Sequence, residues 1–164
     1  MEARWAVFMD SMRVKWVYEL DGYRLPSGVC YLPDFYLPDL AAWMEVKNPA
    51  AVNFAAEKAK VEGLVSLTGK PAYFFDFPPA LPKYADYEKG QICFLQQGDA
   101  AWDDGYLWCE CPQCGQVGFQ YDGRADRINC GCRHEGRIAG YDTDRLQDAF
   151  WMASAKRFEK GGEQ

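Results

Sequence analysis

YLPDFYLP (residues 31–38) and WMEVK (residues 43–47) are the two segments from which the fold of this chain is predicted. Aromatic and aliphatic side chains flank both of them, which predicts one strand over residues 28–37 and a second over residues 41–47. The link Pro38-Asp39-Leu40 is typical of a hairpin turn. The sequence therefore predicts two strands that are neighbours in a sheet.

Asp34, Glu45 and Lys47 are the candidate catalytic residues of this hairpin. Because side chains alternate between the faces of a strand, Glu45 and Lys47 share a face, and strand pairing brings Asp34 close to Glu45. Two carboxylates at one point attract a hard divalent cation, for which we expect Mg²⁺ or Mn²⁺. Lys47 would lie beside the water that the cation polarises. A buried aspartate and a surface Glu–Lys pair on an ordinary hairpin would explain the same residues without catalysis.

The spacing of these residues resembles the active-site motif of the PD-(D/E)xK nuclease superfamily, with Pro33-Asp34, a ten-residue gap and Glu45-Val46-Lys47. A leading helix, the segment KWVYE at residues 15–19 and the proline and aromatic flanks sharpen the match. In that context the chain resembles the phage endonuclease I type of Holliday-junction resolvase, and equally small phage nucleases of the same superfamily. The resemblance covers roughly residues 1–77.

The resemblance implies a fold, an activity and a set of roles. The fold is a restriction-endonuclease-like core of α/β (α+β) class, with element order αβββαβ and a mixed sheet flanked by helices. The activity is metal-dependent hydrolysis of phosphodiester bonds in DNA, structure-specific for junctions or branched substrates. Asp34, Glu45 and the carbonyl of Val46 would bind the catalytic Mg²⁺ (or Mn²⁺). Lys47 would orient or deprotonate the attacking water and stabilise the charge of the transition state.

A helix is predicted to open at Glu2, because Trp5, Phe8, Met9 and Met12 recur at the spacing of one buried face. Glu2 lies three residues before Trp5 and leans toward that face. In the resembling nucleases a glutamate on this helix completes the acidic cluster, so Glu2 is a further candidate catalytic residue. The preference of glutamate for a first helical turn explains it equally well.

Further elements are predicted from periodicity and from Gly and Pro breakers. They are a strand over residues 14–19, a helix over 54–68 ending at Gly69, a buried strand over 71–77, a strand over 92–95 and a helix from Asp142 to Glu159. The helix at 54–68 makes a crossover between two strands. Lys58 borders its apolar face as a candidate phosphate contact or a solvated flank. Lys156, Arg157 and Lys160 are expected in the final turns of the last helix, where cations favour the helix dipole.

Five of the seven cysteines lie within residues 109–132, and this clustering predicts a metal site. Cys111-Pro112-Gln113-Cys114-Gly115 has the form of a zinc knuckle, and Cys130-Gly131-Cys132 follows it. Tight pairs in an intracellular chain favour metal over disulfides. The expected ligands of a structural Zn²⁺ are Cys111, Cys114, Cys130 and Cys132, with His134 as an alternative to Cys132 and Cys109 as a further candidate.

The cysteine spacing predicts a small zinc-ribbon insertion, which could not bury a core unaided. We expect three parts: a nuclease core over residues 1–104, the ribbon over 105–137 and a C-terminal helix over 138–164 that packs on the core. Arginines of the ribbon are candidate nucleic-acid contacts, although ordinary solvated arginines would look the same; they are Arg124, Arg127, Arg133 and Arg137.

The composition indicates a folded protein, with 49% hydrophobic and 16% aromatic residues. A net charge of −6 argues against coating nucleic acid through bulk charge, but it is compatible with a nuclease whose contacts are local and whose acidic site is offset by metal. No apolar run approaches the ~20 residues that cross a bilayer, and no signal-peptide pattern opens the chain. We therefore expect a cytoplasmic protein of a bacterial cell or a phage-infected host.

DNA is the expected partner, with RNA left open and no membrane association. A symmetric junction as substrate would favour a homodimer. The alternative function is a non-catalytic nucleic-acid-binding zinc protein that retains the nuclease fold. Metal-dependent cleavage discriminates between the two.

Overall fold

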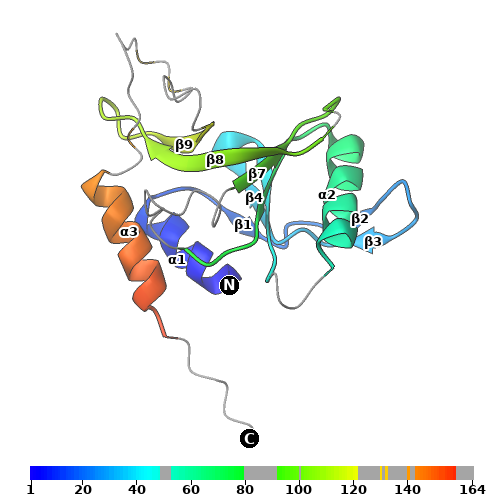
Figure 1. The fold of residues 1–164 in the computed structure, drawn as a ribbon, viewed down its shortest axis with the longest axis horizontal. Helices are drawn as coiled ribbons and strands as arrows, with labels where there is room; N and C mark the ends of the chain where they lie inside the picture. The colour runs from blue at the N-terminus through cyan, green and yellow to red at the C-terminus, as the bar shows by residue number, and fades with distance from the viewer. Residues whose placement is uncertain are drawn as a thin grey trace, which may run out of the picture.

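The computed structural model describes residues 1–48, 53–79, 92–99, 101–121, 130, 132, 140 and 143–157. Within them the chain is an α+β protein with a mixed sheet and three α-helices (Figure 1). The helices are α1 (Glu2–Ser11), α2 (Phe54–Thr68) and α3 (Asp144–Ala155), with a short 3-10 helix η1 (Pro38–Leu40). The strands are β1 (Val17–Tyr18), β2 (Tyr23–Arg24), β3 (Cys30–Tyr31), β4 (Phe35–Leu37), β5 (Ala42–Val46), β6 (Ala72–Phe75), β7 (Ile92–Leu95), β8 (Asp103–Glu110) and β9 (Val117–Tyr121).

Seven strands form one sheet in the order β1-β4-β5-β6-β7-β8-β9. β5 and β6 run parallel, and the other neighbouring strands of this sheet run antiparallel. Parallel neighbours need a crossover, and α2 supplies it, as predicted. β2 and β3 pair as a separate two-stranded sheet. The predicted α+β class with a mixed sheet is confirmed.

Local signals in the sequence fix both ends of α2. The side chain of Asn53 accepts a hydrogen bond from the N–H of Ala56 and so caps the first turn. Gly69 ends the helix in the left-handed conformation, with φ 68°, which a residue without Cβ adopts at no steric cost. The predicted range 54–68 is therefore confirmed at both ends.

The helices cover opposite faces of the sheet (Figure 1). α1 and α3 pack together on one face, where Phe8 and Phe150 have ring centroids 4.5 Å apart. α2 packs on the other face against a cluster that includes Trp43 and Phe74. Along β5 the side chains alternate between the two layers, so Met44 and Val46 face α1 and α3 while Trp43 faces α2. Glu45 and Lys47 follow Trp43 at two-residue intervals, so their side chains project toward the layer of α2 as well.

The predicted strand over residues 28–37 is wrong as a single strand. It divides into β3, which pairs with β2, and β4, which pairs with β5. Between them Leu32 is exposed, and Pro33 has no N–H to donate to a ladder. Asp34 consequently lies just before β4 rather than within a strand.

The predicted strand over residues 14–19 shortens to β1, which ends before Glu19, a residue with a positive φ of 47°. The turn predicted at residues 38–40 is present as η1, which Ala41 closes in the left-handed conformation. The strands predicted over 71–77 and 92–95 are present as β6 and β7.

The C-terminal helix is shorter than predicted. The hydroxyl of Thr143 accepts a hydrogen bond from the N–H of Leu146, so the helix starts at Asp144 rather than at residue 142. It ends at Ala155, where the next residue is extended. Lys156 and Arg157 therefore lie beyond its last turn, which corrects the expectation that they complement the helix dipole. Lys160 and residues 158–159 of the predicted helix lie outside the described residues.

β8 and β9 form the hairpin that carries the first two predicted zinc ligands at its turn. β8 also pairs with β7, so this hairpin extends the main sheet. The predicted domain boundary between residues 104 and 105 falls within β8, and the division into domains stays a prediction. In the part of the chain that the structure describes, no helix has the length and apolar character needed to cross a membrane.

Candidate functional site

Asp34 and Glu45 meet at the end of the β4–β5 hairpin. One carboxylate oxygen of Asp34, Oδ2, accepts a hydrogen bond of 2.8 Å from the N–H of Val46. In return, Oε2 of Glu45 accepts a hydrogen bond of 3.1 Å from the N–H of Asp34. Each acid is thus tied to the backbone beside the other. Both are buried, with 7% of Asp34 and 1% of Glu45 exposed, so the fold holds two carboxylates together away from water.

Lys47 places its ammonium between the two carboxylates. Nζ lies 3.1 Å from Oδ2 and 3.2 Å from Oδ1 of Asp34, and 2.5 Å from Oε1 of Glu45. The contact with Glu45 is an ion pair whose angles do not make it a hydrogen bond. Glu45 of β5 and Lys47, the residue after β5, follow Trp43 at two-residue intervals and so share the face that Trp43 presents to α2. The structure therefore brings the three candidate residues Asp34, Glu45 and Lys47 together.

The acidic groups at this point, Asp34 and Glu45, outnumber the single ammonium of Lys47. Burial and then the neighbouring Glu45 raise the pKa of Asp34 to about 7, against the opposing effects of Lys47 and the N–H of Val46. Burial lowers the pKa of Lys47, but Glu45 and Asp34 outweigh it and raise that pKa to about 12. One ammonium thus faces two buried acids, which is an environment that favours a further cation.

The backbone at Val46 is also turned toward this point. The N–H groups of Trp43 and Lys47 bond to carbonyls of the β6 segment. Since successive residues of a strand point their backbone groups to opposite sides, the N–H and carbonyl of Val46 point toward Asp34. Carboxylate and carbonyl oxygens are the ligands that Mg²⁺ and Mn²⁺ prefer. The donor set of Asp34, Glu45 and Val46 therefore fits such a cation.

Tyr31 is a neighbour of this site that the sequence analysis did not identify. It is 8% exposed and packs in the cluster of Trp43 beneath α2. Burial, and then the charge and contact of the Glu45 carboxylate, raise the pKa of its hydroxyl. The sequence held no signal for this contact, because Tyr31 reads as one more aromatic residue in a strand and its pairing with β2 is a long-range event.

Glu2 is held by a tyrosine of β1. Its Oε2 accepts a hydrogen bond of 2.7 Å from the hydroxyl of Tyr18, which raises the pKa of that tyrosine. Tyr18 pairs with Phe35, the residue after Asp34. Among the described contacts Glu2 is thus linked to Tyr18 rather than to Asp34, Glu45 or Lys47.

Lys58, the predicted phosphate contact, lies over the sheet. Its Nζ is 3.4 Å from Sγ of Cys93, 5.2 Å from the ring centroid of Trp102 and 5.9 Å from that of Phe74. Its charge also counters the rise that burial causes in the pKa of Asp76. The ammonium of Lys58 therefore contacts residues of the α2 side of the sheet, and its role as a phosphate contact stays a prediction.

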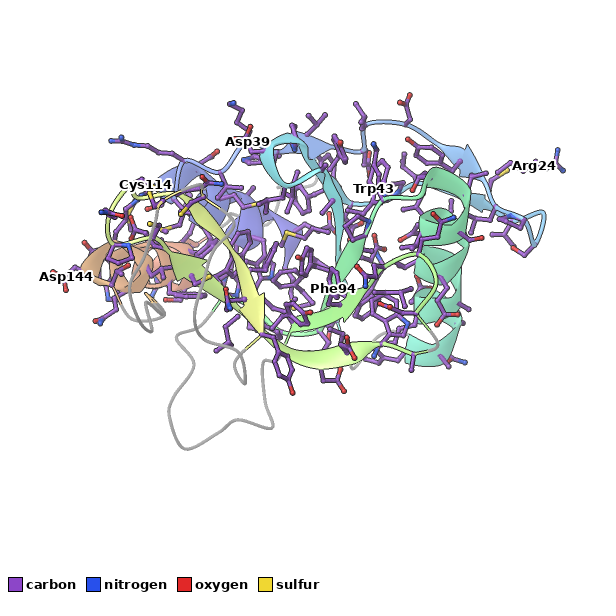
Figure 2. All side chains as sticks on the ribbon, turned by 90° about the horizontal axis from the view of Figure 1, so that it is seen from above. Arg24, Asp39, Trp43, Phe94, Cys114 and Asp144 are labelled. Carbon is purple, nitrogen blue, oxygen red and sulfur yellow. The ribbon has the colours of Figure 1, made fainter. Side chains whose placement is uncertain are left out.

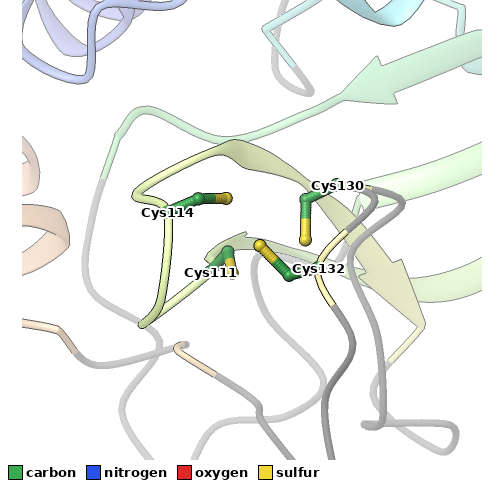
Figure 3. Close-up of side chains that lie close together, drawn as sticks. All are labelled: Cys111, Cys114, Cys130 and Cys132. Carbon is green, nitrogen blue, oxygen red and sulfur yellow. The ribbon is translucent and has the colours of Figure 1, made fainter.

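Four cysteines converge at the end of the β8–β9 hairpin (Figure 3). The ligand atoms of Cys111, Cys114, Cys130 and Cys132 all lie within 4.8 Å of one another, and no disulfide joins them. Sulfurs around a tetrahedral Zn²⁺ are about 3.8 Å apart when the Zn–S bond is about 2.3 Å. The four predicted ligands are therefore placed so that they could hold one zinc ion.

Backbone N–H groups at the knuckle favour the thiolate form of Cys111. Burial works to raise the pKa of the Cys111 thiol, but N–H groups of Cys114 and Gln113 outweigh it and lower that pKa to about 6. The neighbouring Cys114 thiol raises the pKa of Cys132 to about 12. A cation is needed to hold such crowded sulfurs together as thiolates. Cys109 stands apart, because its buried thiol donates to the carbonyl of Gly118 at 3.5 Å.

Arg145 connects the knuckle to the rest of the molecule. Its Nη1 donates to Oε1 of the buried Glu110 at 2.6 Å and to the carbonyl of Gly115 at 3.0 Å, and its Nη2 donates to the carbonyl of Met12. The hydroxyl of Thr143 donates to the other oxygen of Glu110 at 2.7 Å. Figure 2 shows Cys114 at the same end of the molecule as Asp144, away from Trp43 of β5. The cysteine cluster is therefore docked on α3 and is separate from the carboxylates.

The remaining predicted contacts lie outside the described residues. They are Arg124, Arg127, Arg133 and Arg137 as nucleic-acid contacts and His134 as the alternative zinc ligand.

No protein-family model matches this chain, and no curated protein matches it significantly. The function of this chain is therefore inferred from the geometry of the two clusters and from the resemblance of the motif.

Proposed function

We propose that this protein is a metal-dependent endonuclease of the PD-(D/E)xK type that hydrolyses phosphodiester bonds in DNA. The observation that carries the proposal is the convergence of two buried carboxylates, Asp34 and Glu45, on the ammonium of Lys47. A buried acid pair with one lysine is costly to maintain, and the raised pKa of Asp34 is the sign of that cost. A bound divalent cation would remove it.

The element order supports the assignment. α1 precedes β1, β4 and β5, which are neighbours in the sheet, and α2 then crosses to β6 in parallel. With β2 and β3 set aside as an insertion before β4, this order agrees with the αβββαβ order that the resemblance implies. Asp34 lies just before β4 and Glu45 near the end of β5, so both acids lie at the same end of the antiparallel β4–β5 pair.

In this proposal Asp34, Glu45 and the carbonyl of Val46 hold Mg²⁺ or Mn²⁺. When bound, the cation lowers the pKa of a water and neutralises charge on the scissile phosphate. With a cation bound there, the ammonium of Lys47 would move off the carboxylates, because like charges repel. Nearby, it orients the attacking water and stabilises the negative charge of the transition state.

The cysteine cluster has a separate, structural role. Four thiolates complete the coordination of Zn²⁺ and leave no position for a water nucleophile. The cluster lies on the α3 side of the molecule, where Arg145 holds the knuckle. Zinc there would stabilise the β8–β9 hairpin and dock it on α3.

A panel of labelled junction, flap, nicked, duplex and single-stranded DNAs, with matching RNAs, tests the proposal. We expect Mg²⁺- or Mn²⁺-dependent cutting of at least one DNA, strongest for a branched one. Asp34→Ala should abolish the cutting, whereas Asp39→Ala, at an exposed acid of the same hairpin, should not. DNA binding with no cutting under any of these metals would instead support the non-catalytic zinc protein.

A further inference from the structure

The buried hydroxyl of Tyr31 is a polar group beside the carboxylates that the proposed mechanism does not use. Within the described residues three buried side-chain polar atoms make no hydrogen bond of good geometry, and two of them are the hydroxyl of Tyr31 and Oε1 of Glu45. Buried polar atoms are nearly always satisfied in native proteins, so each exception requires an explanation. Here the hydroxyl of Tyr31 lies beside a carboxylate whose Oε1 is in an ion pair with the ammonium of Lys47.

The position of Tyr31 is fixed by packing rather than by polar contacts. Tyr31 is the last residue of β3, and its pairing with Tyr23 holds β3 beside β2. Its ring is buried in the cluster that Trp43 and α2 form. A side chain held in this way keeps its hydroxyl in place at little entropic cost, whatever ion occupies the site.

Lys47 explains why the Tyr31 hydroxyl makes no hydrogen bond of good geometry to Oε1 of Glu45: the ammonium already lies against that oxygen. In the structure its Nζ lies 2.5 Å from Oε1 of Glu45 and supplies the positive charge to that oxygen. A divalent cation bound to both acids would repel the ammonium. Glu45 would then keep only the hydrogen bond that its Oε2 accepts from the N–H of Asp34. The hydroxyl of Tyr31 is a donor that already lies in contact with this carboxylate.

We propose that Tyr31 is a positioning residue for Glu45. When the cation binds and Lys47 withdraws, the Tyr31 hydroxyl donates a hydrogen bond to the Glu45 carboxylate and holds it toward the metal. Partners of this kind fix the orientation of a ligand, and their loss typically weakens metal affinity by about 10- to 100-fold. The proposal rests on the proposed function, since it presumes the cation site of Asp34 and Glu45.

The test is a Mn²⁺ titration of the zinc-loaded protein. Calorimetry measures the heat of binding, and electron paramagnetic resonance measures the concentration of the free ion. We expect Tyr31→Phe to weaken Mn²⁺ binding by about tenfold. Its melting temperature without added Mn²⁺ should stay equal or rise, because only a buried hydroxyl without a hydrogen bond is lost. Tyr36→Phe is the matched control, since Tyr36 packs on Trp43 with centroids 4.8 Å apart, and it should bind Mn²⁺ as the wild type does.

Unchanged Mn²⁺ affinity in a folded Tyr31→Phe protein would overturn the proposal, even if its melting temperature fell. Wild-type protein with no Asp34-dependent Mn²⁺ binding would overturn the cation site itself, and with it the proposed function. If Tyr31→Phe does not fold, Tyr31→Met and Tyr31→Gln replace it as a pair of similar length in which only Gln carries a donor. Tighter Mn²⁺ binding by the Gln variant supports the proposal, and equal binding overturns it.

Discussion

The carboxylate site and the cysteine cluster are both candidate cation sites, but they are built differently. Asp34 and Glu45 are buried within the sheet, and Lys47 of the same chain already places a positive charge between them. The four sulfurs lie at the end of a hairpin, where Cys114 is exposed. Oxygen ligands select Mg²⁺ or Mn²⁺ and thiolates select Zn²⁺.

The difference indicates which metal the fold depends on. The carboxylate site is partly neutralised without metal and is surrounded by packed strands, so loss of its cation should leave the fold intact. The cysteine cluster joins residues from both sides of a long segment of chain, and its sulfurs have little other reason to stay together. We therefore expect one metal to control cleavage and the other to control stability.

The largest expected effect is the loss of cleavage when either acid is removed. Asp34→Ala and Glu45→Ala should each reduce Mg²⁺-dependent cutting to background, because each removes a ligand and leaves Lys47 with a single partner. The folded structure should remain, since repulsion between two buried acids is also removed. Rates on labelled DNA and circular dichroism check both statements.

Asp39→Ala is the control for surface acids of this hairpin, since Asp39 is exposed and pairs only with the exposed Lys15 among the described ion pairs. A double variant of Asp34 and Glu45 that still cuts at the wild-type rate would show that the assigned site is wrong.

The next effect concerns Lys47. Lys47→Ala should slow cleavage by roughly 10²-fold or more, which is typical of a lost acid–base or charge-stabilising group. Mn²⁺ affinity should persist, because the ammonium lies between the ligands and competes with the cation. Single-turnover rates and a Mn²⁺ titration separate the two roles, with Lys15→Ala as the matched surface control. An affinity loss equal to that of Asp34→Ala would contradict this division.

The third effect is on stability at the cysteine cluster. The purified protein should carry about one zinc per chain, consistent with four ligands per ion. Cys114→Ser should lower the melting temperature by on the order of 10 °C, which corresponds to a few kcal/mol in a chain of this size. Residues 105–137 should become sensitive to protease. Cys30→Ser is the control, because Cys30 is an exposed cysteine outside the cluster.

Removal of free divalent ions with a mild chelator should distinguish the metal needed for cleavage from the zinc needed for stability. It should stop cleavage before zinc is lost, and added Mg²⁺ should restore cutting. Protein prepared without chelator that holds no zinc would refute the structural role, as would an unchanged fold in a variant lacking all four cysteines.

The smallest effect is a pH dependence of stability without added divalent ions. The pKa of Asp34 is about 7 in the folded protein against an ordinary value of 3.8, so the folded state binds this proton more tightly than the unfolded state. The free energy of unfolding should therefore fall as pH rises from about 4 to about 7. Urea unfolding at pH 5 and pH 8 measures this, and Asp34→Asn should flatten the difference. A wild-type profile identical to that of Asp34→Asn would exclude the raised pKa.

Local signals made several parts of the fold predictable from sequence. The ends of α2 follow from the capping side chain of Asn53 and the left-handed Gly69, which act within one turn of the helix. The four cysteines of the cluster are expected from the pairs Cys111–Cys114 and Cys130–Cys132, because thiolates two or three residues apart at a turn can share one metal. Glu45 and Lys47 follow from the two-residue period of a strand.

The rest depends on pairings between distant residues. The division of residues 28–37 into two strands depends on the pairing of β3 with β2, and it determines that Tyr31 reaches Glu45. Cys109 and Cys111 look alike in sequence, yet only the partner across the hairpin, Gly118, shows that Cys109 is a core thiol. Arg145 has no signal in the sequence, because its partners Glu110 and Gly115 precede it by 35 and 30 residues.

The packing of α1 against α3 has a consequence for how this protein is synthesised. Phe8 and Phe150 touch across about 140 residues of sequence, and Arg145 reaches back to the carbonyl of Met12. At about 5–20 residues per second a ribosome needs roughly 7–30 s to make the intervening chain. During that time the apolar face of the nascent first helix lacks its last partner and is available to chaperones. Synthesis that stalls before α3 should therefore leave an aggregation-prone fragment, whatever the state of its carboxylate site.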